Sequence, residues 1–266
     1  VWGGNFLLIK FLGTGTSHRI PVVGCNCKTC TSNNPKNKRM RSSIFIQEKN
    51  NDILIDTSPE LRLQMLANDI TNIDLVLFTH AHADHIMGFD DLRVINWLKG
   101  ESVPCYGNKD TMNKIRNIFD YIFDPLQVGG GIPQVTLNTI KSEFEYNNLL
   151  ITPLEVKHGK LDVLGFKIKN MAYITDCSFI PENTFKKLKN IDLLIIDALR
   201  FEEHPTHMNL KEAIEVVKKI NPKKAYFTHI SHEMEHKETN KKLPENMELA
   251  YDGLILKVNK KEVIEN

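Results

Sequence analysis

The segment Thr79–His85 constrains this chain more than any other part of its sequence. It reads THAHADH and brings three imidazoles and one carboxylate together directly after the apolar stretch Leu75–Phe78. Short apolar runs of this kind are typical of buried strands. We therefore expect the polar groups where a strand ends and a loop begins. Imidazole and carboxylate are ligands that Zn, Mn and Fe accept, so the segment predicts a metal site at a strand end.

Two other segments follow the same pattern of hydrophobic strand, threonine and a side chain that can bind a metal. Ala172–Thr175 leads to Asp176, and Ala225–Thr228 leads to His229. His158 also follows a stretch with strand-like alternation. Alone, each residue would be an ordinary hydrogen-bonded group at a strand end. Because they are far apart in sequence, only the fold can unite them, and the shared pattern favours one metal centre.

The spacing of three cysteines near the start of the chain predicts a second kind of metal site. Cys25, Cys27 and Cys30 are separated by one and two residues, and the 266-residue chain holds only five cysteines. A chain of this size does not depend on disulfides. A tetrahedral zinc needs a fourth ligand, and His232, three residues after His229, is the candidate. Three reduced surface thiols are the alternative.

Together these motifs resemble the metallo-β-lactamase superfamily over residues 11–257. The resemblance implies an α/β fold, the four-layer αββα sandwich, with two divalent metal ions at one edge of its sheets. It implies that the first ion is held by His80, His82 and His158, the second by Asp84, His85 and His229, and both by a bridging Asp176. True β-lactamases carry a cysteine at the bridging position. The aspartate therefore points to the phosphodiesterase and thioesterase branches.

The cysteine cluster and the Gly13–Ser17 turn resemble the PhnP-type phosphodiesterases of this superfamily, which hydrolyse small cyclic phosphates. This resemblance implies one structural zinc held by Cys25, Cys27, Cys30 and His232, beside two active-site ions, Zn or Mn. It places Asp56 beneath the histidine motif as a supporting carboxylate. It also implies a proton donor in the segment HPTH, where the spacing to His229 favours His207 over His204.

The expected reaction is hydrolysis of a small, cyclic phosphate diester by metal-bound hydroxide. Two cations lower the pKa of a shared water, and they offset charge on the phosphoryl oxygens. His207 as an imidazolium would protonate the leaving alkoxide, and we count Asp84 with it as catalytic. The alternatives are a tRNA 3′-processing nuclease, a thioesterase of the glyoxalase II type, and a non-catalytic, metal-stabilised binding protein. The sequence lacks the Gly/Pro- and Lys-rich insertion typical of the nucleases.

Composition limits the expected partners and location. With 41% hydrophobic residues, the chain can form one large core, and we expect a single domain over residues 1–266. The formal net charge of +1 provides no field that would attract nucleic acid. No apolar stretch is long enough to span a membrane, and no signal peptide is recognised. We expect a cytoplasmic protein with a small-molecule phosphodiester substrate, and a homodimer is compatible with the sequence.

The remaining pattern predicts a strand-rich chain with interspersed helices. Strands are expected at residues 6–11, 43–48, 52–55 and 193–197, and helices at residues 59–68, 110–119, 181–188 and 210–220. The stretch Tyr121–Ile140 is expected to be irregular, either as a flap near the substrate or as a surface connection. The basic run Lys36–Arg41 is interpreted as a solvated loop rather than a phosphate site.

Overall fold

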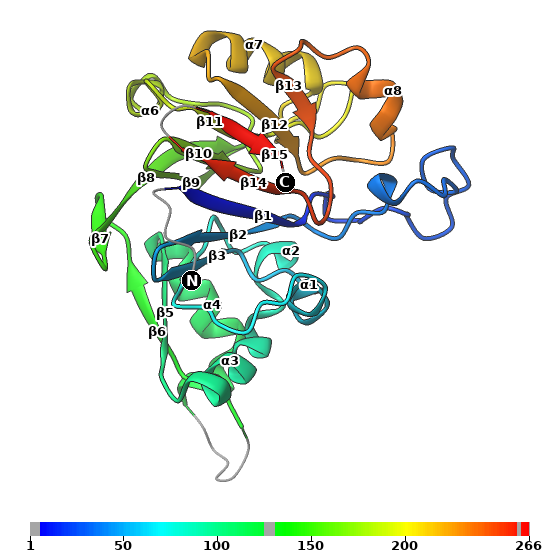
Figure 1. Ribbon diagram of the computed structural model, residues 1–266. Coiled ribbons are helices and arrows are strands. Elements are labelled where there is room, and N and C mark those ends of the chain that lie inside the picture. Colours follow the sequence, from blue (N-terminus) through cyan, green and yellow to red (C-terminus); the bar gives the residue numbers. More distant parts are fainter. Residues whose placement is uncertain (1–5, 125–130, 260–261, 266) are drawn as a thin grey trace.

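Two β-sheets lie face to face at the centre of the computed structural model, which describes residues 6–124, 131–259 and 262–265 (Figure 1). In these residues, the eight-stranded sheet has the order β15 (Val263–Glu265), β14 (Ile255–Val258), β1 (Leu7–Gly13), β2 (Ser43–Glu48), β3 (Asn51–Ile55), β4 (Leu75–Leu77), β5 (Val103–Gly107) and β6 (Val135–Thr139). The described seven-stranded sheet has the order β13 (Met247–Leu249), β12 (Lys224–Thr228), β11 (Leu193–Asp197), β10 (Met171–Ile174), β9 (Leu161–Ile168), β8 (Leu149–His158) and β7 (Phe144–Tyr146).

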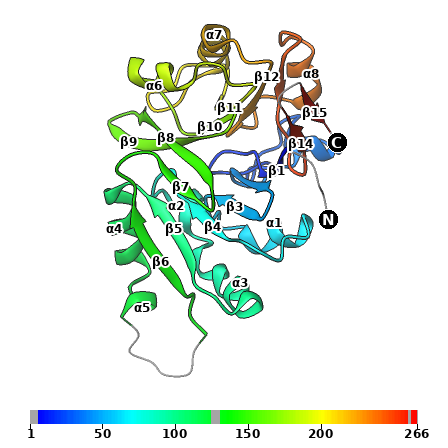
Figure 2. The same ribbon diagram turned by 60° about the vertical axis from the view of Figure 1, so that its left-hand side comes forward.

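Helices cover the outer face of each sheet. One side carries α1 (Leu61–Ala67), α2 (Ala83–Ile86), α3 (Leu92–Lys99), α4 (Lys109–Ile118) and α5 (Asp120–Phe123), and the other carries α6 (Glu182–Lys187), α7 (Leu210–Ile220) and α8 (His236–Asn240) (Figures 1 and 2). Short 3-10 helices lie at Pro35–Asn37 and Phe89–Asp91. The predicted αββα sandwich is therefore confirmed. Within the described residues, no helix combines the length and apolar character needed to cross a membrane.

The alternation of side chains along the strands explains this layering. Residues two apart in a strand point to the same face of the sheet. In β1, Leu7, Ile9 and Phe11 point into the space between the sheets, where the ring of Phe11 lies 6.0 Å from that of Tyr226. The other face of the same sheet presents residues such as Phe45 to the helices. Both faces are buried, so the strands have near-continuous apolar sequences.

Parallel pairing brings the ends of several strands to one edge of the molecule. Strands β3, β4, β5 and β6 pair in parallel, and so do β10, β11, β12 and β13. Their carboxyl ends therefore meet at a common edge, where ligand sites of α/β sheets form. The three segments with the pattern of strand, threonine and ligand follow β4, β10 and β12, so this edge collects them.

Most predicted elements are confirmed, and the differences have local causes. The helix expected from Pro59 begins at Leu61, because Pro59 and Glu60 form a turn first. Strand β3 begins at Asn51, one residue before the expected start at residue 52. The stretch 121–140 is not irregular throughout: it includes part of α5 and all of β6, a half-exposed strand with the polar sequence VTLNT. Residues 125–130 of the predicted flap lie outside the described residues.

The interpretation of Lys36–Arg41 as a solvated loop is wrong for Arg39. This side chain is only 1% exposed. Its Nη1 donates to Thr14 Oγ1 at 2.7 Å and to the carbonyl oxygen of Ala250, and Nη2 lies 3.2 Å from His236 Nδ1. Burial lowers the pKa of Arg39 to about 10. The guanidinium connects segments from both ends of the chain, which the local sequence could not reveal.

Candidate dimetal site

The predicted ligands come together where the carboxyl ends of the strands meet. His80 and His82 lie in the loop after β4, Asp84 and His85 lie in α2, His158 ends β8, Asp176 follows β10, and His229 follows β12. The ligand atoms of His80, His82 and His158 lie within 4.8 Å of one another, and so do those of Asp84, His85, Asp176 and His229. These two groups are the two ligand sets that the sequence predicted. The ligand role of each residue stays a prediction.

Four histidine nitrogens at this centre have no hydrogen-bond partner in the described part of the chain. They are the buried Nε2 atoms of His80, His85 and His229, and the Nδ1 atom of His229. His85 Nε2 lies 3.2 Å from Asp176 Oδ2, and His229 Nε2 lies 3.3 Å from Asp176 Oδ1. Two ligands held about 2.1 Å from a tetrahedral ion are separated by about 3.4 Å. The spacing and the donor set therefore fit divalent cations better than direct hydrogen bonds.

The charges of the site favour metal binding. Burial and the neighbouring His85 hold the pKa of His80 well below its ordinary value, so this imidazole is neutral, as a ligand must be. Burial raises the pKa of Asp176, but His229 and His85 outweigh it and hold that pKa well below its usual range. Burial lowers the pKa of His229, but Asp176 and Asp84 raise it to about 9. Protons therefore compete with cations for this centre.

Three residues at the site adopt a left-handed backbone directly after a strand or its terminal threonine. The φ angles are 63° for Asp56, 52° for Asp176 and 57° for His229. Such conformations are uncommon for residues other than glycine and cost roughly 1–3 kcal/mol each. The surrounding structure therefore holds these backbones in place. The turns direct the side chains of Asp176 and His229 into the shared centre, and that of Asp56 onto His85, which faces the centre.

Hydrogen bonds fix the orientation of the ligands. Asp56 accepts from the backbone N–H of Thr79 at 2.8 Å, and its Oδ2 lies 2.7 Å from His85 Nδ1. His158 Nδ1 lies 2.7 Å from the carbonyl oxygen of Thr206. Both imidazoles thus direct Nε2 toward the centre, as histidines that bind metals commonly do. The predicted position of Asp56 beneath the histidine motif is confirmed.

His207 faces the centre and is paired with an aspartate that the sequence analysis missed. Its Nδ1 lies 3.0 Å from Asp197 Oδ2, and its Nε2 lies 4.0 Å from Asp176 Oδ1. Its ring stacks on that of His229 at 4.8 Å. His204 is more exposed, and its ring centroid lies 5.1 Å from that of His207. Asp197 is the last residue of β11, so the pattern of a buried strand ending in a polar residue could have identified it.

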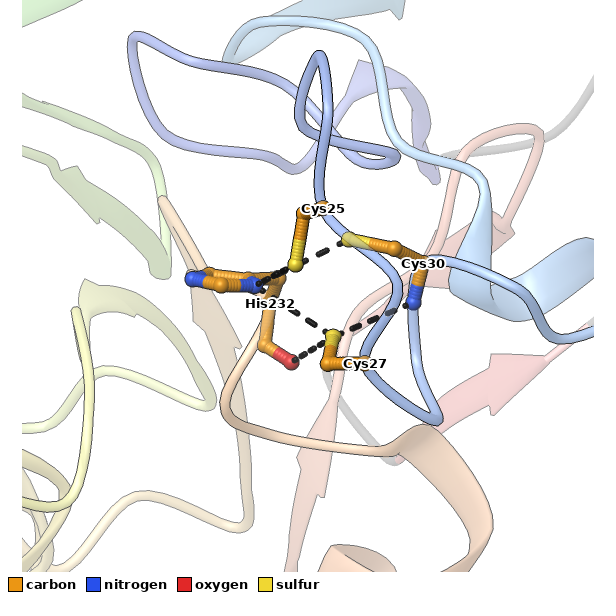
Figure 3. Close-up of side chains that lie close together, drawn as sticks. All are labelled: Cys25, Cys27, Cys30 and His232. Atoms are coloured by element: carbon orange, nitrogen blue, oxygen red, sulfur yellow. Dashed lines mark hydrogen bonds between the residues drawn. The ribbon is translucent and has the colours of Figure 1, made fainter.

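The cysteine cluster forms a separate site, in which Cys25, Cys27, Cys30 and His232 lie close together (Figure 3). The Nδ1 atom of His232 lies 3.2 Å from the sulfur of Cys25, 3.4 Å from that of Cys27 and 3.7 Å from that of Cys30. Sulfur and nitrogen ligands of a tetrahedral zinc are about 3.5 Å apart. Burial raises the pKa of Cys27, but the Cys30 backbone N–H and His232 lower it to about 6, which favours the thiolate that binds metals.

Comparison with known families agrees with the fold and this site. The family described as "Beta-lactamase superfamily domain" matches residues 51–230. The chain therefore belongs to the beta-lactamase superfamily. A crystal structure of a new diphosphatase from the PhnP family is 37% identical, superposes with a TM-score of 0.90, and covers 95% of this chain and 97% of that chain. This likeness places the chain in the PhnP branch of the superfamily.

Two curated relatives are longer than this chain. An octanoyltransferase of Porphyromonas gingivalis is 37% identical over 95% of this chain and 52% of that protein. A ribonuclease Z of Clostridioides difficile is 24% identical over 70% of this chain and 64% of that protein. The chain therefore spans about half to two thirds of the length of these relatives. The fold alone is shared with Zn²⁺-bound PqqB of Methylobacterium extorquens, at 19% identity, a TM-score of 0.76 and coverage of 94% and 100%.

Proposed function

We propose that this protein is a dimetal-dependent phosphodiesterase that hydrolyses a small, cyclic phosphate diester. The observation that carries the proposal is the set of buried, unpartnered histidine nitrogens arranged around Asp176. An ionised aspartate at this position only accepts hydrogen bonds and can offset part of the charge of two cations at once. The assignment to the PhnP branch supports the same class of chemistry.

The ligands would hold two divalent ions, Zn or Mn, and the cysteine site would hold one structural zinc. When bound, the active-site ions would act as Lewis acids and activate water. Closed sites built from cysteine and histidine contribute to folding, whereas sites with an open position support catalysis. The free thiols of the chain fit a cytoplasmic location, because disulfides are rare there.

Residues of the protein would supply the proton that the leaving group needs. His207 holds Nε2 toward the centre while Asp197 accepts from Nδ1, so Asp197 keeps the ring in one orientation. A protonated His207 can therefore donate from Nε2 to a departing alkoxide. Asp84, which lies 3.6 Å from His229 Nε2, adds negative charge that retains the cations.

A comparison of substrate classes tests this proposal. The protein loaded with Zn²⁺ or Mn²⁺ should hydrolyse bis(p-nitrophenyl) phosphate and at least one 2′,3′-cyclic nucleotide, and should leave S-lactoylglutathione intact. Rapid hydrolysis of the thioester without diester hydrolysis would replace the proposal with a thioesterase. An octanoyl thioester belongs in the panel, because one long relative is named an octanoyltransferase.

A second candidate is hydrolysis of a linear diphosphate. The diphosphatase structure from the PhnP family, 37% identical to this chain, favours it. The same metal ligands could support hydrolysis of a cyclic diester or of a linear diphosphate, because both reactions displace an oxygen from phosphorus. Comparing kcat/KM for a 2′,3′-cyclic nucleotide with that for a dinucleoside diphosphate separates the two. A short tRNA precursor tests the nuclease alternative, which the ribonuclease Z relative raises.

A further inference from the structure

A surface cavity of about 460 Å³ lies between the loop of residues 34–36 and α8. Its lining residues are Asn34, Lys36, His236, Lys237, Asn240 and Lys241, and none of them is a predicted metal ligand. Three are lysines, and no carboxylate lines the cavity in the described part of the chain. The volume suits a small molecule, and the charge suits an anion. Exposed lysines alone do not define a binding site, but two buried side chains adjoin them.

Arg39 is the first of these buried side chains. It is 1% exposed, its Nε has no hydrogen-bond partner, and it forms no ion pair with a carboxylate among residues 6–124, 131–259 and 262–265. Its hydrogen-bond partners are Thr14, Ala250 and His236. Burial lowers its pKa to about 10, although Asp252 and Glu235 act against that effect, so the guanidinium is charged near neutral pH. A buried cation without a direct counterion is costly, so an anion bound nearby would stabilise it.

His236, which lines the cavity, is the second buried side chain. Its Nδ1 lies 3.2 Å from Arg39 Nη2, and its Nε2 lies 3.2 Å from Asn240 Nδ2. Burial and Arg39 lower the pKa of His236 to about 4, so the ring is neutral near neutral pH. Because a guanidinium only donates, Nδ1 accepts and Nε2 carries the hydrogen of the neutral ring. Asn240 Oδ1 already accepts from the backbone N–H of Leu249 at 2.8 Å, so the Nε2–H of His236 faces another donor and lacks an acceptor within the described residues.

The acidic side chains beside α8 are engaged with other partners. Glu235 accepts from Asn37 Nδ2 at 2.6 Å and from the backbone N–H of Glu238 at 2.7 Å. Glu238 pairs with Lys28. Neither carboxylate lines the cavity. The lysines and His236 therefore have no carboxylate within the cavity, as the described residues form it, to occupy their donors.

We propose that this cavity binds a small oxyanion of the phosphate class, held by the Nε2–H of His236 and by the three lysines. Phosphate oxygens only accept hydrogen bonds from such groups, and their charge would offset that of Arg39 behind the imidazole. The bound anion would connect the N-terminal loop to α8, as the cysteine site connects Cys25–Cys30 to His232. The site is separate from the predicted dimetal ligands and goes beyond the proposed function.

Lysine acetylation, measured by mass spectrometry, tests this site separately from any anion bound at the dimetal site. The full chain, loaded with its metals, is treated with a limiting acetylating reagent in inorganic phosphate, or in chloride at the same ionic strength. Phosphate should slow acetylation of Lys237 and Lys241 at least about threefold, because charge-assisted hydrogen bonds would occupy both ammonium groups. Lys242 is exposed but does not line the cavity, so it should react equally fast in both salts. AMP in place of phosphate distinguishes a phosphorylated metabolite from the free ion, by protecting at lower concentration.

Lys241→Gln and Lys242→Gln form a matched pair, because they remove the same charge one residue apart. Lys241→Gln should raise the phosphate concentration that half-protects Lys237 by about 10-fold, which corresponds to about 1.4 kcal/mol, whereas Lys242→Gln should not change it. In protein labelled with ¹⁵N-histidine, phosphate should also shift the Nε2 resonance of His236, assigned by its loss in His236→Gln. No protection in the wild type, equal protection of Lys242, equal effects of the two variants, or an unmoved His236 resonance would overturn the proposal.

Discussion

The dimetal site and the cysteine site bring their predicted metal ligands together from different parts of the chain. The predicted dimetal ligands come from four strand ends between His80 and His229, and all except His82 and Asp84 are nearly or fully buried. The cysteine site takes three ligands from six consecutive residues and one from His232, and two of its cysteines are half-buried. The first site therefore depends on the whole fold, whereas the second can hold a local loop in place.

This difference predicts which protein property each site controls. The dimetal site is buried, and cations or protons must offset the negative charge of its carboxylates. Because this site also has open positions for a substrate, it should control catalysis. A closed set of thiolates contributes binding energy to folding, so it should control stability. The following changes test that separation, from the largest expected effect on hydrolysis to the smallest.

Asp176→Asn should abolish nearly all hydrolysis and lower the metal content of the dimetal site. The amide is uncharged and cannot offset the charge of the two cations, although it occupies a similar volume. Elemental analysis and diesterase assays should show about one remaining zinc per chain, with the fold intact by circular dichroism. Asp162→Asn is the control, because Asp162 is an exposed carboxylate paired with Lys157. An active Asn variant with full metal content would rule out the bridging role.

His207→Ala should lower kcat by roughly 10²–10⁴-fold while both active-site ions remain, as expected for a lost general acid. The loss should shrink for p-nitrophenyl esters, because p-nitrophenolate leaves without needing a proton. The control is His204→Ala, which removes the more exposed neighbouring imidazole. If His207→Ala loses metal instead, His207 is a ligand, a role that its closeness to His158 and Asp176 permits.

Asp197→Asn should lower kcat by about 10–100-fold, the range typical of partners that orient a functional histidine. Asp197 accepts from His207 and from the backbone N–H of Cys177, and the amide would favour a different orientation of the ring. A double-mutant cycle provides the check. Asp197→Asn should have little further effect in a His207→Ala background; additive losses would mean that Asp197 acts through His229 instead.

Cys27→Ser should remove one zinc per chain and lower the melting temperature by at least about 5 °C, a shift that corresponds to roughly 2 kcal/mol for a domain of this size. Hydrolysis should change by less than about threefold once the dimetal site is loaded. Calorimetry and elemental analysis measure both effects. Cys105→Ala, at a buried cysteine outside the cluster, should retain the zinc. Unchanged zinc content in Cys27→Ser would contradict the structural site.

The sequence was informative where several side chains that can bind metals lie in one short segment. Thr79–His85 and Cys25–Cys30 predicted both clusters of side chains that the structure brings together, and the pattern of strand, threonine and ligand added Asp176 and His229. The sequence analysis overlooked Asp197, although this residue ends the buried strand β11 and contacts His207. It failed for Arg39, because the partners of this side chain lie at both ends of the chain. Strand β6 was missed because its half-exposed sequence lacks an apolar run. Contacts between distant residues leave no local signal.

The pairing of β1 with β14 has a consequence for synthesis of the chain. Strand β1 lies between β2 and β14, and residues 7–10 pair with residues 255–258. On the ribosome, one edge of the first strand therefore has no strand partner until almost the whole described chain has emerged. Exposed strand edges promote pairing between chains, and contacts this distant in sequence slow folding. We therefore expect this edge of β1 to stay without its strand partner in the nascent chain until β14 has been released.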